Sequence, residues 1–577
     1  MQPYRFLSAT TAEGVKPNMW DWIALPLVLG IVLLLAWGAA QMSAPYQVGA
    51  ALPISLDPSN LPYYLMRTTI RMLLAMACAL LFSIGVAFLA AKNRQAEKAI
   101  IPALDILQSI PILGFLSITV TGFIALFPGN LLGVECAAIF AIFTSQVWNM
   151  TFSLYQSLKT IPADLDEAAT MFHLSLWQRF WQLELPFAMP GLLWNAMMSM
   201  SGGWFFVVAS EAITVNGQEI NLPGIGSYIA LAIKQQALGA VLWAVLAMAL
   251  GILLYDQLLF RPLVAWADRF RFEQTNSEVV PDSWVLRLLS RAPLVQALIV
   301  LPVGRLWDWI TPRFRLRHDG TAHRTQLKLP QRMVDIGWNS VLMLLSAYAT
   351  LQIGHFIFSE TSWSEIANVF GLGLLTLLRV FVLTIVASLI WVPIGVKIGM
   401  NPHLALKVQA LAQFMAAFPA NLLFPLAVIV IVYWDLNPNI WLSPLIILGT
   451  QWYILFNVVA GASGIPSELR EAATNFGLKG WLRWKRFLLP GIFPSYVTGA
   501  VTATGGSWNA SIVAEMVSWG NTTLRAEGLG CYIAEMTAKG DFPRIALGIA
   551  MMVFFVVCVN RLVWRRLYRL AETRLRI

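Results

Sequence analysis

Charge is scarce in this sequence. Only 12% of its 577 residues are Asp, Glu, Lys or Arg, about half the usual share in a soluble domain, and 58% are hydrophobic. Such a chain can hide its surface only in a membrane, which excludes a soluble globular protein. Its apolar stretches run for about 20 residues, enough for a helix to cross a bilayer, and they lack the alternation of barrel strands. We therefore predict an all-α, polytopic membrane protein.

Cysteine, histidine and catalytic motifs are equally sparse. The four cysteines and five histidines are scattered without a CxxC pair, which argues against a metal or disulfide site. The sequence contains no nucleophile–base cluster that would support a membrane enzyme. It also lacks a Gly-x4-Gly-Lys-Ser/Thr phosphate loop, so we predict that the chain binds no cofactor and hydrolyses no ATP itself. No nucleic-acid partner is expected.

About twelve transmembrane helices are predicted, in two sets of six. A proline interrupts the third span of each set, Pro111 in the first and Pro419 in the second, which packed neighbours tolerate inside a membrane. The predicted spans lie near residues 20–41, 69–91, 101–127, 132–155, 186–208, 237–261, 335–358, 374–398, 404–432, 438–462, 490–514 and 543–564.

The two sets are copies of one unit. Residues 167–186 read EAATMFHLSLWQRFWQLELP and residues 471–490 read EAATNFGLKGWLRWKRFLLP, with ten identical residues at an offset of 304. A Trp-x6-Glu pattern and then a Gly-x-Gly-x-Tyr-Ile pattern follow each copy at the same offset. The repeat indicates one unit of roughly 250 residues used twice in tandem. We expect a first domain over 1–271, a linker over 272–330 and a second domain over 331–577.

The linker is rich in arginine and contains one apolar run that is too short for a span. If the linker crossed the membrane, an odd number of crossings would separate the repeated segments and place them on opposite sides. We therefore predict that the linker lies at the membrane surface as an amphipathic helix. Lysine and arginine mark the cytoplasmic side of a membrane. If the repeated segments are cytoplasmic, 32 of the 39 Lys and Arg residues lie on that side, together with the N- and C-termini.

The repeated segment has the features of a short amphipathic helix along the membrane. Periodicity alone leaves open whether this helix packs on its own protein or on a partner. The segment resembles the EAA loop of ABC importer permeases: Glu-Ala-Ala, three residues, Gly, nine residues, an apolar residue, one residue, Leu-Pro. The second copy fits throughout, and in the first copy His replaces the Gly. The predicted docking residues are Glu167, Ala168, Ala169, His173, Glu471, Ala472, Ala473 and Gly477.

The Trp-x6-Glu and Gly-x-Gly-x-Tyr-Ile patterns are similar to those of nitrate/taurine/sulfonate-type permeases. The resemblance implies two permease domains fused in one chain, which form a substrate pathway by alternating access. It implies two copies of a cytoplasmic ABC ATPase that use ATP and Mg²⁺, a periplasmic or lipid-anchored solute-binding protein, and a bacterial-type inner membrane. The implied substrate is a small anion such as nitrate, bicarbonate or a sulfonate.

The histidine suggests that the two EAA segments differ. Glycine permits the tight turn inside such a segment, whereas histidine resists a positive φ. We therefore expect unequal docking, with the second copy making the stronger contact. Its additional cations can pair with acidic groups on the ATPase or with lipid headgroups. These cations are Lys479, Arg483, Lys485 and Arg486.

Ionisable residues near spans are candidates for the substrate pathway. Arg71 and Arg379 occupy equivalent places, and two guanidiniums facing one cavity would suit a planar anion. Alternatively, each arginine reaches the headgroups or pairs with a carboxylate. Glu211 and Glu515, which end later spans, are either gate residues or partners of these arginines, and we favour pairing. The two tryptophans either line the pathway or serve as packing anchors. The predicted pathway residues are Arg71, Arg379, Trp204, Trp508, Glu211 and Glu515.

A twelve-helix secondary transporter, which uses no ATPase, is the main alternative because it is also built from repeats. Proton or sodium coupling would require carboxylates inside the membrane. The predicted span interiors are nearly free of Asp and Glu, apart from Asp105 and Glu135 near span ends. The paired EAA segments also have no role in such a transporter.

Overall fold

The first half of the chain is a bundle of helices with one short hairpin. The computed structural model describes residues 17–46, 52–215, 218–267, 270, 283–300 and 331–574. The elements of the first half are α1 (Asp21–Gln41), η1 (Pro58–Asn60), α2 (Leu61–Lys92), α3 (Arg94–Leu107), α4 (Ile112–Leu126), α5 (Leu132–Lys159), α6 (Ala163–Met171), α7 (Leu176–Arg179), η2 (Phe180–Glu184), α8 (Leu185–Glu211), β1 (Ala212–Val215), β2 (Gln218–Asn221), α9 (Ile225–Lys234), α10 (Leu238–Tyr255), η3 (Asp256–Phe260) and α11 (Arg261–Ala267).

The second half repeats this order. Its elements are α15 (Gln331–Phe358), α16 (Trp363–Gly399), α17 (Pro402–Ala417), η6 (Ala420–Leu423), α18 (Phe424–Tyr433), α19 (Pro438–Trp441), α20 (Ser443–Leu448), α21 (Gln451–Ser463), α22 (Ser467–Asn475), α23 (Gly480–Arg483), η7 (Trp484–Leu488), α24 (Leu489–Ala514), β3 (Met516–Trp519), β4 (Thr522–Arg525), α25 (Leu529–Lys539), α26 (Phe542–Val559), η8 (Asn560–Trp564) and α27 (Arg565–Arg574). Each hairpin is antiparallel, and the pair Ala212–Asn221 recurs as Met516–Arg525 at an offset of 304.

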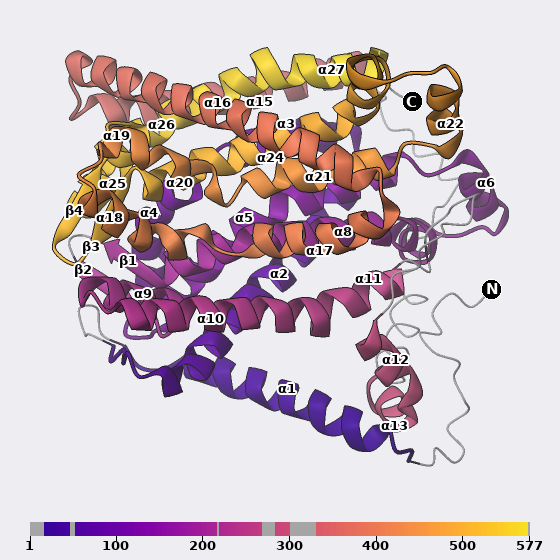
Figure 1. Cartoon of the computed structure of the whole chain (residues 1–577), viewed down its shortest axis with the longest axis horizontal. Coiled ribbons are helices and arrows are strands. Elements are labelled where there is room, and N and C mark those ends of the chain that lie inside the picture. The colour runs from indigo at the N-terminus through magenta and orange to yellow at the C-terminus, as the bar shows by residue number, and fades with distance from the viewer. Residues whose placement is uncertain are drawn as a thin grey trace.

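The two ends of the bundle carry different elements (Figure 1). The short helices α6 and α22 project at one end, where α11 also ends, whereas the four strands lie at the other end with α9 and α25. The segments that resemble EAA loops therefore share one end of the molecule, as two repeats with the same direction require.

The spans confirm an all-α polytopic fold. Among the described residues, eight helices are long and apolar enough to cross a membrane, or up to eleven if each bent pair is one span. The predicted eleventh span, α24, falls outside this set because glycine, serine and threonine lower its hydropathy. Its counterpart α8 is among the eight, as part of Leu176–Glu211. Polar and small residues suit α24 because it packs inside the bundle, with Ala500, Ala503 and Ser507 fully buried.

The predicted proline breaks are confirmed. Pro111 precedes the first residue of α4, and Pro419 precedes η6, each with an extended backbone. The helices on either side of Pro419 meet at 75°. A proline cannot donate a backbone hydrogen bond and clashes with the preceding turn, so the helix ends there and a new one starts.

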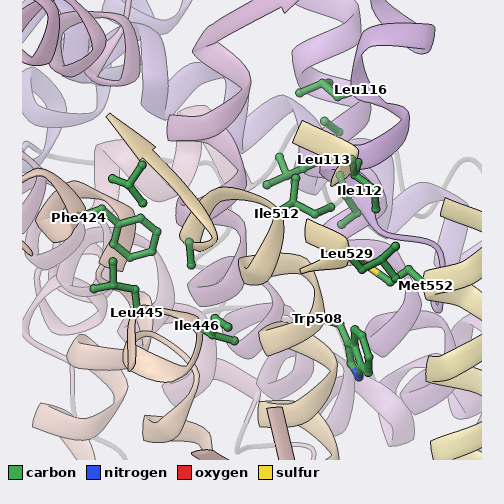
Figure 2. Packing of buried hydrophobic residues seen from close by; sticks show 14 of the residues in the cluster. Ile112, Leu113, Leu116, Phe424, Leu445, Ile446, Trp508, Ile512, Leu529 and Met552 are labelled. Carbon is green, nitrogen blue, oxygen red and sulfur yellow. The ribbon is translucent and has the colours of Figure 1, made fainter. Parts of the chain in front are cut away.

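The hydrophobic core joins the two halves. One cluster combines Ile112 and Leu116 of the first half with Phe424, Trp508 and other residues of the second (Figure 2). A hydrogen bond of 2.8 Å from the Ile112 N–H to Asn509 Oδ1 crosses the same boundary. The halves therefore pack as one body, while α1 and α15 lie at the periphery with mostly exposed apolar side chains that suit lipid.

The described part of the predicted linker contains α12 (Trp284–Arg291), α13 (Pro293–Val295) and η5 (Gln296–Val300). Val285 and Leu288 of α12 are buried, and Asp21 Oδ1 at the start of α1 accepts from the Leu294 N–H at 2.9 Å. This stretch is thus a short amphipathic helix docked on α1. The rest of the predicted linker, 272–282 and 301–330, lies outside the described residues.

Candidate functional site

The two EAA segments fold into the same elements. Each starts after a proline with a short helix, α6 or α22, and continues through a turn into α7 or α23 and then a π-helix. The turn has φ 51° at His173 and φ 65° at Gly477. A left-handed backbone costs a residue with a side chain about 1 kcal/mol, so histidine adopts the glycine turn at a modest cost. The histidine does not alter the turn, and this reason for unequal docking is removed.

Local hydrogen bonds explain why the turn survives. The N–H groups of Leu174 and Leu478 reach back to the carbonyls of Ala169 and Ala473 at 3.1 and 3.0 Å, which closes each helix with a Schellman-type bond. In the first segment, Ser175 and the side chain of Gln178 also form a capping box for α7, whereas α23 has no side-chain cap. The cap helps to hold the strained turn in the first copy.

An exposed phenylalanine follows each of these helices. Phe172 and Phe476 follow α6 and α22 and are 78% and 83% exposed. The second alanine of each motif, Ala169 or Ala473, is only 4% exposed and faces the protein's own interior. Exposed phenylalanines at equivalent positions are typical of an interface that awaits a partner. The other predicted docking residues are exposed at Glu167, His173, Glu471 and Gly477 and half-buried at Ala168 and Ala472.

The two segments differ in charge. Residues 163–186 hold four acidic and one basic side chain, a net charge of −3, whereas residues 467–490 hold two acidic and five basic, a net charge of +3. The two segments therefore present opposite electric fields to whatever binds them.

At the opposite end of the first half, two arginines and two carboxylates form a buried cluster. Arg71 Nη1 donates to Glu211 Oε1 and Arg71 Nε donates to Glu135 Oε2, both at 2.6 Å. Arg67 Nη2 donates to Glu135 Oε1 at 2.6 Å. All four side chains are at most 1% exposed. Two guanidiniums face two carboxylates, so the cluster is neutral, as burial inside a membrane protein requires.

The second half contains a smaller version of this cluster. Arg379 Nη1 donates to Glu515 Oε1 at 3.1 Å, and Arg379 Nη2 donates to Asn439 Oδ1 at 3.3 Å. Thr376 Oγ1 also donates to Glu515 Oε1 at 2.9 Å. The pairing that we favoured for both glutamates is thus confirmed.

The two clusters differ by a paired exchange. Leu375 stands where the repeat places Arg67, and Asn439 takes the place of Glu135. One cation and one anion are replaced together, so each half keeps a neutral cluster. In each cluster the charges of the arginines are thus neutralised by carboxylates.

Glu211 and Glu515 each also cap a short helix. Glu211 Oε2 accepts from the Gly226 N–H in α9 at 2.6 Å, and Glu515 Oε2 accepts from the Cys531 N–H in α25 at 3.1 Å. A negative charge at a helix N-terminus is favourable. A Cβ atom on Gly224 would lie 2.3 Å from the Glu211 carboxyl carbon, so the first glycine of the Gly-x-Gly pattern makes the approach possible. Burial raises the pKa of the Cys531 thiol to about 11, which keeps it neutral beside its carboxylate.

A cavity of about 580 Å³ lies between the halves. Its wall combines α4, α5 and α8 of the first half with α18, α21, α24 and α26 of the second. Hydroxyl, amide and aromatic groups line it, among them Asn149, Ser199 and Trp508. Within the described part of the chain, none of its lining residues is Asp, Glu, Lys, Arg or His. The cavity therefore mixes apolar surface with uncharged polar groups and carries no fixed charge.

The predicted pathway residues are not gathered at this cavity. Trp508 lines it and stacks on Phe555, with ring centroids 6.3 Å apart and planes 11° apart. The equivalent Trp204 instead lies in the core of the first half, edge-on to Tyr255 at 5.9 Å. The two arginines and two glutamates lie in the ion-pair clusters instead. The sequence therefore identified one cavity residue, and its role in transport stays a prediction.

The comparison with known families decides the identity of the chain. The family model described as "Binding-protein-dependent transport system inner membrane component" matches residues 79–261 and 391–577, well over half of the sequence. The chain belongs to this family. Each match contains one EAA segment and one Gly-x-Gly helix start, so the permease unit is present twice, as the repeat predicted.

Individual relatives resemble about half of this duplicated permease. The bicarbonate transport system permease protein CmpB of Synechococcus elongatus is 26% identical over 285 residues, 45% of this chain and 96% of its own length. The nitrate import permease protein NrtB of Leptolyngbya laminosa is 24% identical over 221 residues, 37% of this chain and 76% of its own. The osmoprotectant import permease protein OsmY of Salmonella typhimurium is 25% identical over 230 residues, 39% and 91% respectively.

Membership in the family settles the general role. The chain is the multi-pass inner-membrane permease of an ATP-driven importer, and ATP hydrolysis belongs to partner subunits. The family also implies a solute-binding protein as a partner. A secondary transporter that works without an ATPase is not favoured.

Proposed function

We propose that this single chain forms the complete substrate pathway of an importer for a small anion. Two copies of an ATPase, loaded with ATP and Mg²⁺, dock on α6 and α22, and a periplasmic or lipid-anchored binding protein approaches the hairpin end. The N- and C-termini are then cytoplasmic. The observation that carries this proposal is the pair of exposed phenylalanines that follow α6 and α22 at matching turns. These two helices project at the same end of the bundle (Figure 1).

The charge-free cavity supports a pathway between the halves. An anion there meets amide and hydroxyl donors, since each buried arginine is neutralised by a carboxylate. We infer that Arg71, Arg379, Glu211 and Glu515 hold α9 and α25 on α8 and α24 and do not contact the substrate. Asn149, whose side chain is exposed in the cavity wall, is a candidate donor to the substrate.

Reconstitution tests the proposal. The chain is purified with its ATPase, placed in proteoliposomes with the binding protein, and assayed for ATP-dependent uptake of nitrate, bicarbonate and taurine. We expect uptake of at least one of these solutes and loss of ATPase binding in the double variant Phe172→Ala/Phe476→Ala. ATPase binding that survives in the double variant, or uptake that needs no ATP, would reject the proposal.

A net-neutral zwitterion is the second candidate substrate. The cavity lining, which is rich in aromatic groups and free of ionic side chains, requires no net charge on the solute, and one relative is named for osmoprotectants. Quaternary ammonium groups bind favourably on aromatic faces. Uptake of glycine betaine without uptake of nitrate or bicarbonate would favour this candidate over an anion.

A further inference from the structure

The first docking segment is tied to transmembrane helices by a chain of charges. Glu184 in η2 is completely buried, and its Oε1 accepts from Lys92 Nζ at 2.5 Å and from Arg179 Nε at 2.7 Å. Arg179 also pairs with Asp166 in the docking helix α6. These four side chains, which we call the relay, connect α6, α7, η2 and the C-terminal end of α2. The π-helix η2 continues directly into α8, so the relay also reaches that helix.

The second half lacks both acidic members of the relay. At an offset of 304, Arg470 stands in place of Asp166 and Leu488 in place of Glu184. Leu488 is buried in an apolar cluster that includes Ala473 of α22. The second docking segment therefore meets its π-helix through apolar contact.

The second docking helix has its own attachment. The guanidinium of Arg470 in α22 donates to the carbonyl oxygens of Ala462, Ser463 and Ile465 at 3.2, 2.8 and 3.0 Å. These residues lie at the C-terminal end of α21 and just after it, where helix carbonyls lack partners and favour a cation. The second segment is thus tied to α21, whereas the first is tied to α2.

A buried carboxylate resists separation from its cations. Moving the end of α2 away from α7 and η2 would leave Glu184 charged, buried and short of a partner, which is far more costly than moving an apolar side chain along an apolar surface. Glu184 therefore makes α7, η2 and the end of α2 move together, and the Asp166–Arg179 pair joins α6 to them. Apolar contact in the second half allows more sliding.

We propose that Asp166, Arg179, Glu184 and Lys92 are positioning residues that transmit movement of the first docking segment to α2 and α8. The second segment drives its half through α21 instead, by way of Arg470. The two halves of the pathway are then moved through different helices, although the sequence repeats. This inference rests on the proposed docking of an ATPase at α6 and α22.

Uptake per ATP hydrolysed tests the relay. In proteoliposomes with the ATPase, the binding protein and nitrate, bicarbonate or taurine, Glu184→Leu and the double variant Lys92→Met/Glu184→Leu reproduce the apolar side chain of the second half. We expect ATPase co-purification and ATP hydrolysis to be retained, while uptake per ATP falls severalfold. The control Leu488→Met, in the second half, leaves the ratio unchanged. Uptake and hydrolysis that fall in parallel, or do not change, would overturn the proposal.

A distance measurement keeps the relay testable without an ATPase. Spin labels at Thr170→Cys in α6 and Leu89→Cys in α2, with the native cysteines replaced by serine, report how firmly the two helices are joined. We expect one narrow distance distribution, broadened by Glu184→Gln and by Glu184→Leu. Equal widths in all three proteins would reject the relay. Failure of the unaltered chain to bind an ATPase would instead reject the proposed docking.

Discussion

Exchanging Arg67 and Glu135 for the residues of the second half tests how buried charge holds the hairpin end together. Arg67→Leu leaves one guanidinium against two carboxylates, and Glu135→Asn leaves two guanidiniums against one carboxylate. Removal of one partner from a buried ion pair costs about 3–5 kcal/mol, because the other charge stays buried without compensation. The double variant has one charge of each sign, as the second half does.

The geometry ranks the two single variants. Glu135 accepts three hydrogen bonds, from Arg67 Nη2 at 2.6 Å and from Arg71 Nε and Nη2 at 2.6 and 2.8 Å. Arg67 donates one of these, and its buried Nε has no partner within the described residues. We therefore expect Glu135→Asn near the upper end of that range and Arg67→Leu near the lower end. The double variant is expected to lose only about 1–2 kcal/mol, so the coupling between the two sites is about 6 kcal/mol.

Unfolding of the purified chain in detergent, followed by heat or denaturant, measures these differences. Lys539→Gln, which removes an exposed charge, serves as a control and should change stability by less than about 0.5 kcal/mol. A double variant as unstable as the sum of its single variants would refute the reasoning, since it would show that neutrality does not govern the cluster.

Three further predictions concern docking and the cavity. Phe172→Ala and Phe476→Ala should each weaken ATPase binding by roughly tenfold or more, since docking buries the aromatic ring that each variant removes; unchanged binding in pull-down would contradict the proposed contact. His173→Gly should keep or raise the melting temperature, because it relieves about 1 kcal/mol of left-handed strain, and a lower melting temperature would contradict this account of the turn. Asn149→Asp should reduce anion uptake by placing a negative charge in the cavity wall, with Asn149→Gln as the matched control; unchanged uptake in Asn149→Asp would exclude the cavity as the anion's route.

Features set by local pattern were predictable from the sequence. The spans follow from runs of apolar residues, and the breaks at Pro111 and Pro419 follow from the chemistry of proline. The two segments that we propose to dock an ATPase were found because the same spacing of small, acidic and proline residues occurs twice. The position of the turn at His173 could be predicted, but whether histidine would alter its backbone conformation could not. The compensating capping box at Ser175 depends on how α7 begins.

Features set by packing between distant segments were not predictable. Arg67 lies four residues before Arg71, so both occupy one helix face, but their partner Glu135 is 64 to 68 positions away. Whether an arginine faces a cavity or a carboxylate depends on how α2 meets α5. The same holds for Trp204 and Trp508, which are equivalent in sequence but differ in surroundings because the halves pack asymmetrically around the cavity.

The repeat supplies an internal comparison that one copy alone could not. The carboxylate that caps a short helix, the left-handed turn and the exposed phenylalanine occur in both halves, so they belong to the permease unit itself. The halves differ where charge is buried. Arg67 and Glu135 are replaced together, whereas Glu184 gives way to Leu488 and the short helix α22 gains Arg470 and a new attachment. A change of one buried charge alone would be destabilising. Fusion in one chain ensures that a first half always pairs with a second half. Each half can therefore acquire its own link between its proposed docking helix and the pathway.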